Sequence, residues 1–512
     1  MKKIFFVSMF VMFVNFVFAN NLAISTPIYS DASKTITFNI SWDNSWKITT
    51  GPSNFDGVWV FIKRQACSST NIWASALVST ISSEHTTSIT GTNLLTVDAV
   101  GDGMGVFIRR TSSGLGNIAA HTIVLKLNSG LATKPAITAS ATDNFKIMGV
   151  EMVYVPKGAF YLGDGRSTNT TNFSSGDNSS TALLIDEAKQ LAGLGGASVY
   201  TANAVNGCPN NLPATFPLGY DGFWCMKYEL SAVSYTDFLN CLTYDQQAVR
   251  LSKWGTRYPN AVNNAFTAGM SNKNDIHIIT AGTYNTIPAV FSIATNNWNK
   301  YSPTGYLSWL DLTAYLDWSG LRPVTEFEYE KLCRGTATPV ANEYPWGSTT
   351  ITQTGRYYAD NAGAFNEISP NTGEGLCKYA QQNDDNYAPW RSGFAATNIS
   401  TRSQAGATYY GIMEIGGNVW EQVVGGGSGY DFSGFTTANG DGILGSDGNA
   451  NTTGWPNAFG ANTGNYIKGG GYDWNTTTTM IQISDRTFYA GISYSNGQYS
   501  YVGGRGIRSF TY

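Results

Sequence analysis

Near its C-terminal end the chain carries the segment Gly416-Gly-Asn-Val-Trp-Glu-Gln422. It places a tryptophan between a Gly-Gly-Asn turn and the carboxylate of Glu421, although only 13% of the chain is charged. Glycines let the chain turn tightly at this point. Glu421 could take part in chemistry, or it could hold structure by bonding the backbone of its own turn. Both interpretations stay open on this segment alone.

The composition indicates a large, β-rich, loop-rich protein. A chain of 512 residues exceeds one typical core, so we expect two or three domains. The sequence is 42% hydrophobic and 13% aromatic, and its charged fraction is about half the usual share. The formal net charge is −4, and Lys and Arg form no cluster beyond short pairs. We therefore expect no nucleic-acid partner.

The N-terminus has the pattern of a secretory signal. Lys2 and Lys3 precede an apolar run that ends at Phe18, and Val17 and Ala19 fit the −3 and −1 positions of a cleavage site. We predict a signal peptide over residues 1–19, cut after Ala19, and no membrane span in the mature chain. The alternative, a membrane anchor, is disfavoured because the run is short. The expected location is the periplasm, the cell surface or the extracellular space.

Residues 20–140 are predicted to form an all-β domain. Short apolar or alternating runs are separated by turn residues, and no helical period appears. The favoured fold is an immunoglobulin-like β-sandwich. A single sheet or a barrel is the alternative. The predicted strands include Thr35–Trp42, Val58–Ile62, Gly105–Ile108 and Ile123–Leu127.

A polar segment, Thr138–Asn144, is predicted to be a linker, and a second pattern follows it. Thr325-Glu-Phe-Glu328 fits a capping box at the start of a helix. Residues 425–465 are rich in Gly, Asn, Thr and Asp, which predicts a long irregular insertion. Two further helices are predicted at Ser231–Leu242 and Trp309–Trp318.

Several short blocks follow one another in this second part. They are Met152-Val-Tyr-Val-Pro-Lys-Gly158, Lys227-Tyr-Glu-Leu-Ser231, Leu321-Arg-Pro-Val-Thr-Glu-Phe-Glu-Tyr-Glu330, Tyr344-Pro-Trp-Gly347, Tyr410–Glu421, Lys468-Gly-Gly-Gly471 and Gly506-Ile-Arg508. In this order they resemble the formylglycine-generating enzyme (sulfatase-modifying factor) family, whose fold is related to C-type lectins. The resemblance implies a multidomain chain in which an α+β domain of that type, over residues 146–512, follows the β-sandwich.

The resemblance also implies a structural calcium. Carried over by position, its ligands would be the carboxylates of Glu414 and Glu421 and the backbone carbonyls of Gly417 and Val419. Glu414 stands where the family usually has a shorter Asp or Asn. A second calcium site would involve Asp360-Asn361 and Asn371–Gly375, but the expected Asp after that segment is missing.

The cysteines that carry catalysis in this family are missing from the chain. The family's oxidases bind copper through two cysteines, because Cu(I) is soft and prefers thiolates. Trp474 and Thr479 occupy those positions here, so copper is not expected. A non-catalytic role is favoured over an enzymatic one, which stays open.

Six cysteines remain for disulfides, and their pairing is open. Proximity in sequence favours a bridge among Cys208, Cys225 and Cys241. Cys333 matches a structural cysteine of the family whose usual partner position lies near Ser484. Cys333 is therefore left to pair with Cys377 or to stay free.

Without the copper site, a lectin-like scaffold offers a binding surface. Rigid aromatic side chains among short polar ones are typical of recognition surfaces. The function predicted is a non-catalytic binding or structural module with a protein or glycan ligand at the cell envelope. The alternatives are a formylglycine-generating-type oxidase and a diversified or carbohydrate-binding adhesin. The predicted ligand face, near residues 472–501, comprises Tyr472, Asp473, Trp474, Asn475, Tyr494, Tyr499 and Tyr501.

Overall fold

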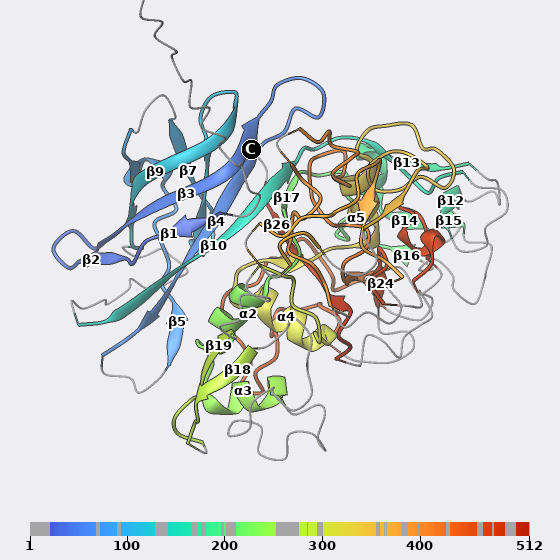
Figure 1. Cartoon of the computed structure of the whole chain (residues 1–512). Coiled ribbons are helices and arrows are strands. Elements are labelled where there is room, and N and C mark those ends of the chain that lie inside the picture. Colours follow the sequence, from blue (N-terminus) through green and yellow to red (C-terminus); the bar gives the residue numbers. More distant parts are fainter. Residues whose placement is uncertain are drawn as a thin grey trace, which may run out of the picture.

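The chain folds into two main sheets, one of which is shared by both parts of the sequence (Figure 1). Strands dominate this computed structural model, and its helices are few and short. Its described residues are 21–510, without 68–71, 90–93, 129–141, 166–171, 176–180, 196–198, 201–210, 252–275, 284, 294–300, 355–358, 363, 365, 381–387, 398, 426–430, 458–463, 474–475 and 487–497. The predicted signal peptide and most of the predicted linker lie outside them.

The first sheet belongs to the N-terminal part alone. Its strand order is β1-β3-β9-β6, and β2 pairs with β3. The strands predicted within Thr35–Trp42 and Ile123–Leu127 form parts of β3 and β9. The bounds are β1 (Ala23–Ile24), β2 (Ile28–Ser30), β3 (Thr35–Lys47), β6 (Thr86–Thr87) and β9 (Gly114–Lys126), and the 3-10 helix η1 (Ser82–Glu84) precedes β6.

The second sheet runs through both parts of the chain. Its order is β20-β26-β17-β10-β4-β8-β7, and β5 pairs with β4. The antiparallel pairing of β10 with β4 runs from Asn144 opposite Gln65 to Val153 opposite Asp56. The sheet thus continues across the predicted domain boundary. The bounds are β4 (Asp56–Gln65), β5 (Trp73–Ser75), β7 (Leu95–Ala99), β8 (Gly105–Arg110), β10 (Asn144–Val155), β17 (Phe223–Met226), β20 (Arg322–Pro323) and β26 (Gly506–Ser509).

Strand β4 is buried on both faces. Val58, Val60 and Ile62 pack with residues of β3 and β9 in an apolar cluster between the two sheets. Trp59 and Phe61 point the other way, into the large core of the second part. Side chains alternate across a strand, so a strand between two cores needs a continuous apolar run. This explains the uninterrupted Val58–Ile62 segment.

The predicted helices are confirmed, with small changes in their bounds. Ser231 caps α2 by accepting from the Ser234 backbone N–H. At the start of α5, the hydroxyl of Thr325 accepts from the backbone N–H of Glu328, at 3.1 Å. The carboxylate of Glu328 accepts from the Thr325 N–H at 3.0 Å, so the capping box is present. The helices are α1 (Glu187–Ala192), α2 (Ala232–Leu239), α3 (Tyr244–Leu251), α4 (Trp309–Trp318) and α5 (Glu326–Arg334).

The remaining strands are short. β23 lies between β24 and β25, and the other strands form two-stranded pairs. Within the described residues of 425–464 no helix or strand is assigned, as the irregular insertion predicts. The bounds are β11 (Phe160–Leu162), β12 (Ser174–Ser175), β13 (Leu183–Ile185), β14 (Leu194–Gly195), β15 (Val199–Tyr200), β16 (Asn211–Leu212), β18 (Ile276–Thr280), β19 (Val290–Ile293), β21 (Thr352–Gln353), β22 (Leu376–Cys377), β23 (Trp420–Val424), β24 (Asn465–Lys468), β25 (Val502–Gly503) and the 3-10 helix η4 (Thr478–Ile481).

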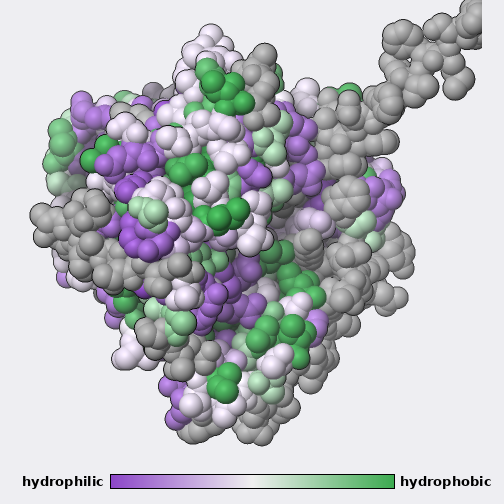
Figure 2. All heavy atoms as spheres, turned by 90° about the vertical axis from the view of Figure 1, so that its left-hand side faces the viewer, coloured by the Kyte–Doolittle hydropathy of each residue, from purple (hydrophilic) through white to green (hydrophobic). Residues whose placement is uncertain are grey.

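On the face shown in Figure 2, apolar side chains form separate patches among polar ones. Such scattered exposure is usual for a protein surface. Over the described ranges, no helix has both the length and the apolar character that crossing a membrane requires.

Candidate functional site

The loop before β23 has an unusual backbone. Glu414, Gly417 and Asn418 all have positive φ angles, of 49°, 78° and 61°. At Gly417 a Cβ atom would lie 2.4 Å from the Sγ of Cys377 and 2.6 Å from the carbonyl oxygen of Lys378. Only glycine fits both this conformation and this close approach. The Gly-Gly-Asn turn is therefore held against the segment that contains Cys377.

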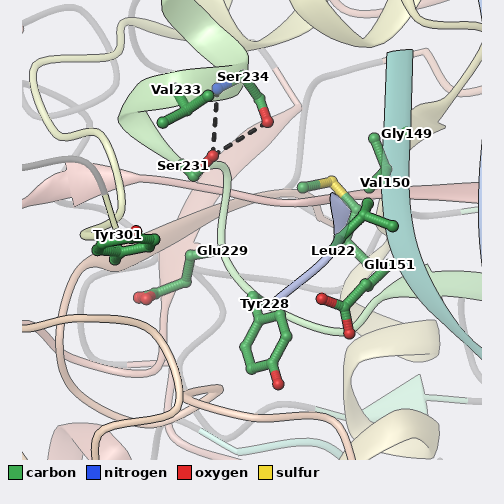
Figure 3. A pocket seen from close by; sticks show the side chains of 11 residues that line it. Leu22, Gly149, Val150, Glu151, Tyr228, Glu229, Ser231, Val233, Ser234 and Tyr301 are labelled. Atoms are coloured by element: carbon green, nitrogen blue, oxygen red, sulfur yellow. Dashed lines mark hydrogen bonds between the residues drawn. The ribbon is translucent and has the colours of Figure 1, made fainter. Parts of the chain in front are cut away.

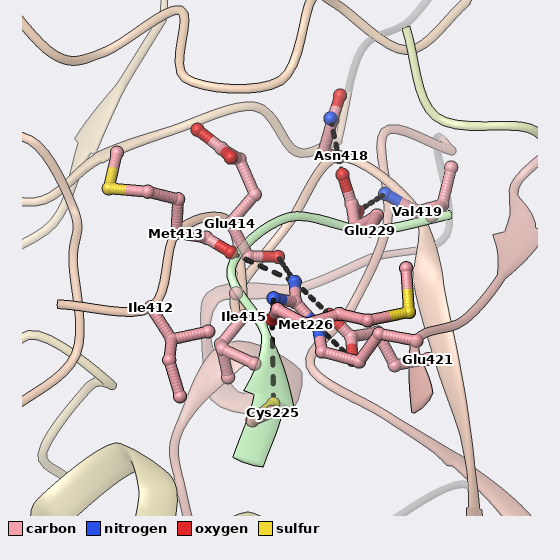
Figure 4. A network of polar contacts seen from close by, with 12 residues as sticks. Cys225, Met226, Glu229, Ile412, Met413, Glu414, Ile415, Asn418, Val419 and Glu421 are labelled. Atoms are coloured by element: carbon pink, nitrogen blue, oxygen red, sulfur yellow. Dashed lines mark hydrogen bonds and ion pairs between the residues drawn. The ribbon is translucent and has the colours of Figure 1, made fainter. Parts of the chain in front are cut away.

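Glu229 lies beneath this loop and was not among the predicted site residues. One of its carboxylate oxygens accepts from the side chain of Asn418 at 2.8 Å, and the other accepts from the Val419 backbone N–H at 3.0 Å (Figure 4). The carbonyl oxygen of the Asn418 side chain accepts from the Trp390 N–H at 2.9 Å. Burial raises the pKa of Glu229 well above its ordinary value. In the sequence, Glu229 was marked only by its place in the block Lys227–Ser231, one of the blocks that resemble the family.

Glu421 is paired with an arginine. The Nε atom of Arg505 lies 2.8 Å from each carboxylate oxygen of Glu421, and Nη2 lies 2.6 Å from one of them. Neither side chain has appreciable exposure, at 0% for Arg505 and 2% for Glu421. Burial raises the pKa of Glu421, and the charge of Arg505 opposes that rise. The carboxylate of Glu421 thus binds the guanidinium of Arg505.

Glu414 turns to a different partner. Its Oε1 accepts from the Gly393 backbone N–H at 2.9 Å. Its Oε2 is buried and has no hydrogen-bond partner in the part of the chain that the structure describes. Burial raises the pKa of Glu414 to about 7. Figure 4 shows the Glu414 side chain pointing away from Glu421.

The predicted calcium ligands therefore share one loop, but the arrangement does not fit an ion held by both carboxylates. Both oxygens of Glu421 are engaged by Arg505, and Glu414 lies apart from them. The other two predicted ligands, the carbonyls of Gly417 and Val419, belong to the same loop, which is anchored through the amides of these residues to Gly469 and Glu229. Across the described ranges, no group of three or more His, Cys, Asp and Glu side chains is placed to hold a metal.

The second predicted calcium segment has its own hydrogen bonds. Asp360 pairs with Ile368 through backbone bonds. The Asn371 side chain donates to the carbonyl of Gln353 at 2.8 Å. The two halves of this predicted site are thus tied to neighbouring backbone.

The comparison with known families gives one match. The Sulfatase-modifying factor enzyme 1-like domain covers residues 138–490. The chain belongs to the sulfatase-modifying factor family. This confirms the resemblance in the C-terminal part, while the block Gly506-Ile-Arg508 lies beyond the matched residues.

Two curated relatives of the sulfatase-modifying factor family are similar over part of the chain. The formylglycine-generating enzyme of Mus musculus is 28% identical over 214 residues, which cover 39% of this chain and 48% of the mouse protein. That of Thermomonospora curvata is 30% identical over 119 residues, covering 23% of this chain and 32% of the bacterial protein. The chain thus spans about half or less of the length of these relatives.

The similarity to a solved structure is too low to inform the fold. A chain from a study of Streptococcus parasanguinis adhesion by Fap1 fimbriae overlaps 36% of this chain and 78% of its own length. The sequence identity is 13% and the TM-score is 0.12.

In this sulfatase-modifying factor chain, much of the predicted ligand face is buried or outside the described residues. Tyr472 has no exposed area, because it packs inside the domain, and Asp473 is 3% exposed. Asp473 accepts from the indole N–H of Trp420 at 2.7 Å and from the Thr476 hydroxyl at 2.8 Å. Both side chains are thus withdrawn from the surface by packing and hydrogen bonding. Trp474, Asn475 and Tyr494 lie outside the described residues.

Two tyrosines of that face are half-buried. Tyr499 and Tyr501 stack with ring centroids 5.5 Å apart and an interplanar angle of 19°. Together with Met480 they pack against a small cluster formed by Trp420, Ile467 and Val502. The exposed residues Thr477–Thr479 directly precede Met480. We call Thr477–Thr479, Tyr499 and Tyr501 the tyrosine face.

The family's copper positions hold no thiol in this chain. Thr479 is exposed in η4, and Trp474 lies outside the described residues. Cys225, Cys241, Cys333 and Cys377 are buried and unbridged, and Cys67 is exposed and unbridged. The suggested pairing of Cys333 with Cys377 is therefore wrong, as is one between Cys225 and Cys241. Cys208 lies outside the described residues.

Burial keeps the described inner thiols protonated. It raises the pKa of Cys241 to about 11 and that of Cys333 well above the ordinary value. Cys225 and Cys377 are shifted in the same direction by burial. A protonated thiol is a poor nucleophile and a poor metal ligand.

A cavity of about 200 Å³ lies where the two parts of the chain meet (Figure 3). Gly149–Glu151 of β10 line one side, and the segment from Tyr228 to Ser234 lines another. Glu151 is 6% exposed, and its Oε1 has no hydrogen-bond partner in the described ranges. Leu22, Met226 and Tyr301 also line it. Its wall thus combines apolar side chains with the largely buried side chain of Glu151.

Proposed function

We propose that this protein is an exported, non-catalytic binding or structural module built on the sulfatase-modifying factor scaffold. One observation carries the proposal: Trp474 and Thr479 stand where the family's oxidases have copper-binding cysteines. Neither an indole nor a hydroxyl replaces a thiolate as a ligand of Cu(I). The buried, protonated thiols of Cys225, Cys241, Cys333 and Cys377 offer no substitute.

The tyrosine face is the proposed ligand surface. Tyr499 and Tyr501 present stacked aromatic rings, and Thr477–Thr479 add exposed hydroxyl groups. No charged side chain belongs to this set. Aromatic rings beside uncharged hydroxyls suit a glycan, because ring faces bury the apolar face of a sugar while the hydroxyls exchange hydrogen bonds. A glycan of the cell envelope is therefore the favoured ligand, and a protein ligand is the other outcome of the test.

The proposal also covers the location and the N-terminal part. Residues 1–19 supply the export signal, and the mature protein resides in the periplasm, at the cell surface or outside the cell. Residues 20–140 form an immunoglobulin-like sandwich, which the apolar cluster between the two sheets supports. The mass of the protein recovered from the producing organism tests the signal: cleavage after Ala19 is expected, and a retained N-terminus would contradict it.

Catalysis is tested with the mature chain and a peptide that bears the sulfatase cysteine motif. The protein is incubated with copper, calcium and a reductant, and mass spectrometry follows conversion of the cysteine to formylglycine. We expect none, while a formylglycine-generating enzyme run in parallel converts the peptide. The double variant Trp474→Cys/Thr479→Cys, which installs thiols, reports whether the scaffold can otherwise support the reaction. Conversion by the unmodified chain would overturn the proposal.

Binding is tested on a glycan array and on envelope protein extracts. The variant Tyr499→Ala/Tyr501→Ala is expected to lose glycan binding. The matched control, Tyr29→Ala, removes a half-buried tyrosine of the N-terminal part and should leave binding unchanged. Binding to a protein fraction that the double variant abolishes would replace the glycan with a protein ligand. Equal binding by both variants would remove the tyrosine face from the proposal.

A further inference from the structure

Arg505 is enclosed by oxygen atoms from three segments of the chain. Besides the Glu421 carboxylate, its Nη2 donates to the carbonyls of Met413 at 2.8 Å and Glu414 at 3.2 Å. Its Nη1 donates to the carbonyls of Met226 at 3.1 Å and Lys227 at 3.3 Å. One carboxylate and four carbonyls thus surround a fully buried guanidinium.

This is the kind of shell that calcium attracts in proteins. Calcium takes six to eight oxygens from carboxylates, backbone carbonyls and waters. A guanidinium carries a full positive charge on five N–H donors in a plane, and it can satisfy a carboxylate and several carbonyls at once. Arg505 uses both possibilities: it meets both Glu421 oxygens and the carbonyls at the start of the loop.

We propose that the guanidinium of Arg505 takes the place of the structural calcium at the loop Glu414–Glu421. The loop is held by a cation that belongs to the chain itself, and its folding does not depend on metal. The disagreement between the predicted ligand set and the observed contacts motivates this inference, which stands apart from the proposed ligand binding.

Charge and coordination both support the replacement. Glu421 and Arg505 neutralise each other, so a divalent ion at Glu421 would meet a fixed positive charge in a site with little water to screen it. Calcium would also have to displace the guanidinium from two carboxylate oxygens. A displaced Arg505 would leave its charge buried and unpaired, which is costly.

The same contacts explain what the cation does for the fold. Met226 ends β17, Met413 and Glu414 open the loop, Glu421 lies in β23, and Arg505 directly precedes β26. The guanidinium therefore fixes the loop to two separate sheets, the shared sheet and the β24-β23-β25 sheet. A single metal ion in the loop would need ligands from the same segments to join them in this way.

The first arm of the test uses the unmodified mature chain. Thermal unfolding is followed in saturating calcium and in excess EDTA, and calcium binding is measured by titration calorimetry. We expect the same Tm in both buffers. A lower Tm in EDTA that disappears in Glu421→Gln would overturn the proposal, because the loop would then hold calcium through that carboxylate.

The second arm uses Arg505→Leu, which leaves the oxygens without a cation. We expect a lower Tm in EDTA and a partial recovery in calcium, since the carboxylate and carbonyls are then open to the ion. The matched control is Arg508→Leu, which removes another buried arginine that bonds Asp102 at 2.6 Å. It should lower Tm equally in both buffers. A Tm for Arg505→Leu equal to that of the unmodified chain in EDTA would contradict the proposal. If Arg505→Leu fails to fold, the first arm decides.

Discussion

Lys227 and Asp56 form a buried ion pair that joins the two parts of the chain. The ammonium lies 3.4 Å from Oδ2 of Asp56 in β4 and 3.2 Å from Oε2 of Glu151 in β10. Asp56 also accepts from the hydroxyl of Ser45 and from the Trp46 backbone N–H. One lysine from the second part therefore pairs with carboxylates on two strands of the shared sheet.

Loss of this ammonium should be strongly destabilising. In Lys227→Met, Asp56 and Glu151 stay buried without their cation, and removing one partner of a buried pair typically costs about 3–5 kcal/mol. Urea-induced unfolding measures the change. The control Lys157→Met removes an exposed pair with Glu187 and should have no measurable effect. A loss no larger than in the control would show that the pair does not contribute to folding.

The second part should not fold without the first. A chain that begins at residue 142 loses β4, so the long edge of β10 and the core around Trp59 and Phe61 are exposed to water. Trp59 also donates to the carbonyl of Ser319 at 2.8 Å. We expect the truncated chain to aggregate or to lack cooperative unfolding in circular dichroism. A monomer with a sharp transition would show that the two parts are separable domains.

Gly417→Ala should destabilise the loop more than a glycine substitution in open space. The positive φ alone costs an alanine about 1–2 kcal/mol, and overpacking against Cys377 and Lys378 adds about 1–3 kcal/mol. Gly51→Ala is the matched control, because Gly51 has a φ of 69° and no atom within 4 Å of the added Cβ. Chemical denaturation compares the two variants. Equal losses would mean that the close approach at Gly417 relaxes freely.

Lys63 should make stability rise with pH above neutrality. Burial lowers the pKa of Lys63 from 10.5 to about 7 in the folded chain. Between these values the unfolded chain binds the proton more readily, so the free energy of unfolding increases as pH rises, by at most about 1.4 kcal/mol per pH unit. Below pH 7 both states are protonated, and this dependence disappears.

The variant Lys63→Met isolates this contribution. Between pH 7 and pH 9, the free energy of unfolding measured by denaturation should rise less steeply with pH than in the unmodified chain. Lys331, whose pKa burial also lowers to about 7, contributes to the slope in the same direction. In the double variant Lys63→Met/Lys331→Met, the free energy of unfolding should therefore depend on pH even less than in Lys63→Met. An unchanged slope in both variants would place the two ammonium groups in a more polar environment than their burial indicates.

The sequence predicted local structure well where the signal is local. The capping box at Thr325 and Glu328 depends on residues three apart, and the structure contains it. The apolar run Val58–Ile62 indicated a buried strand, but no local pattern indicated that its second face packs on α4. There Phe61 and Trp318 meet edge to face, with ring centroids 5.2 Å apart. Strand pairing across the domain boundary is a long-range property that the linker pattern did not contain.

The site was predicted only in part, for the same reason. The motif placed Glu421 in the correct loop, yet its partner Arg505 is distant in the sequence and appeared only as a residue beside a C-terminal block. Tyr472 and Asp473 follow a glycine run and alternate with polar residues, which favoured exposure. Their burial depends on the distant segment 418–420, because the indole N–H of Trp420 donates to Asp473 and the carbonyl of Asn418 accepts from the Tyr472 backbone N–H.

The position of β26 has a consequence for how the chain reaches its native state. β26 lies inside the shared sheet, between β20 and β17, and Ser509 pairs with Phe223. Contacts so far apart in sequence form late, because a long loop must close first. The sheet cannot be completed during synthesis until almost the whole chain has emerged. Until then β17 keeps one unpaired edge, and such an edge exposes the partly synthesised chain to aggregation.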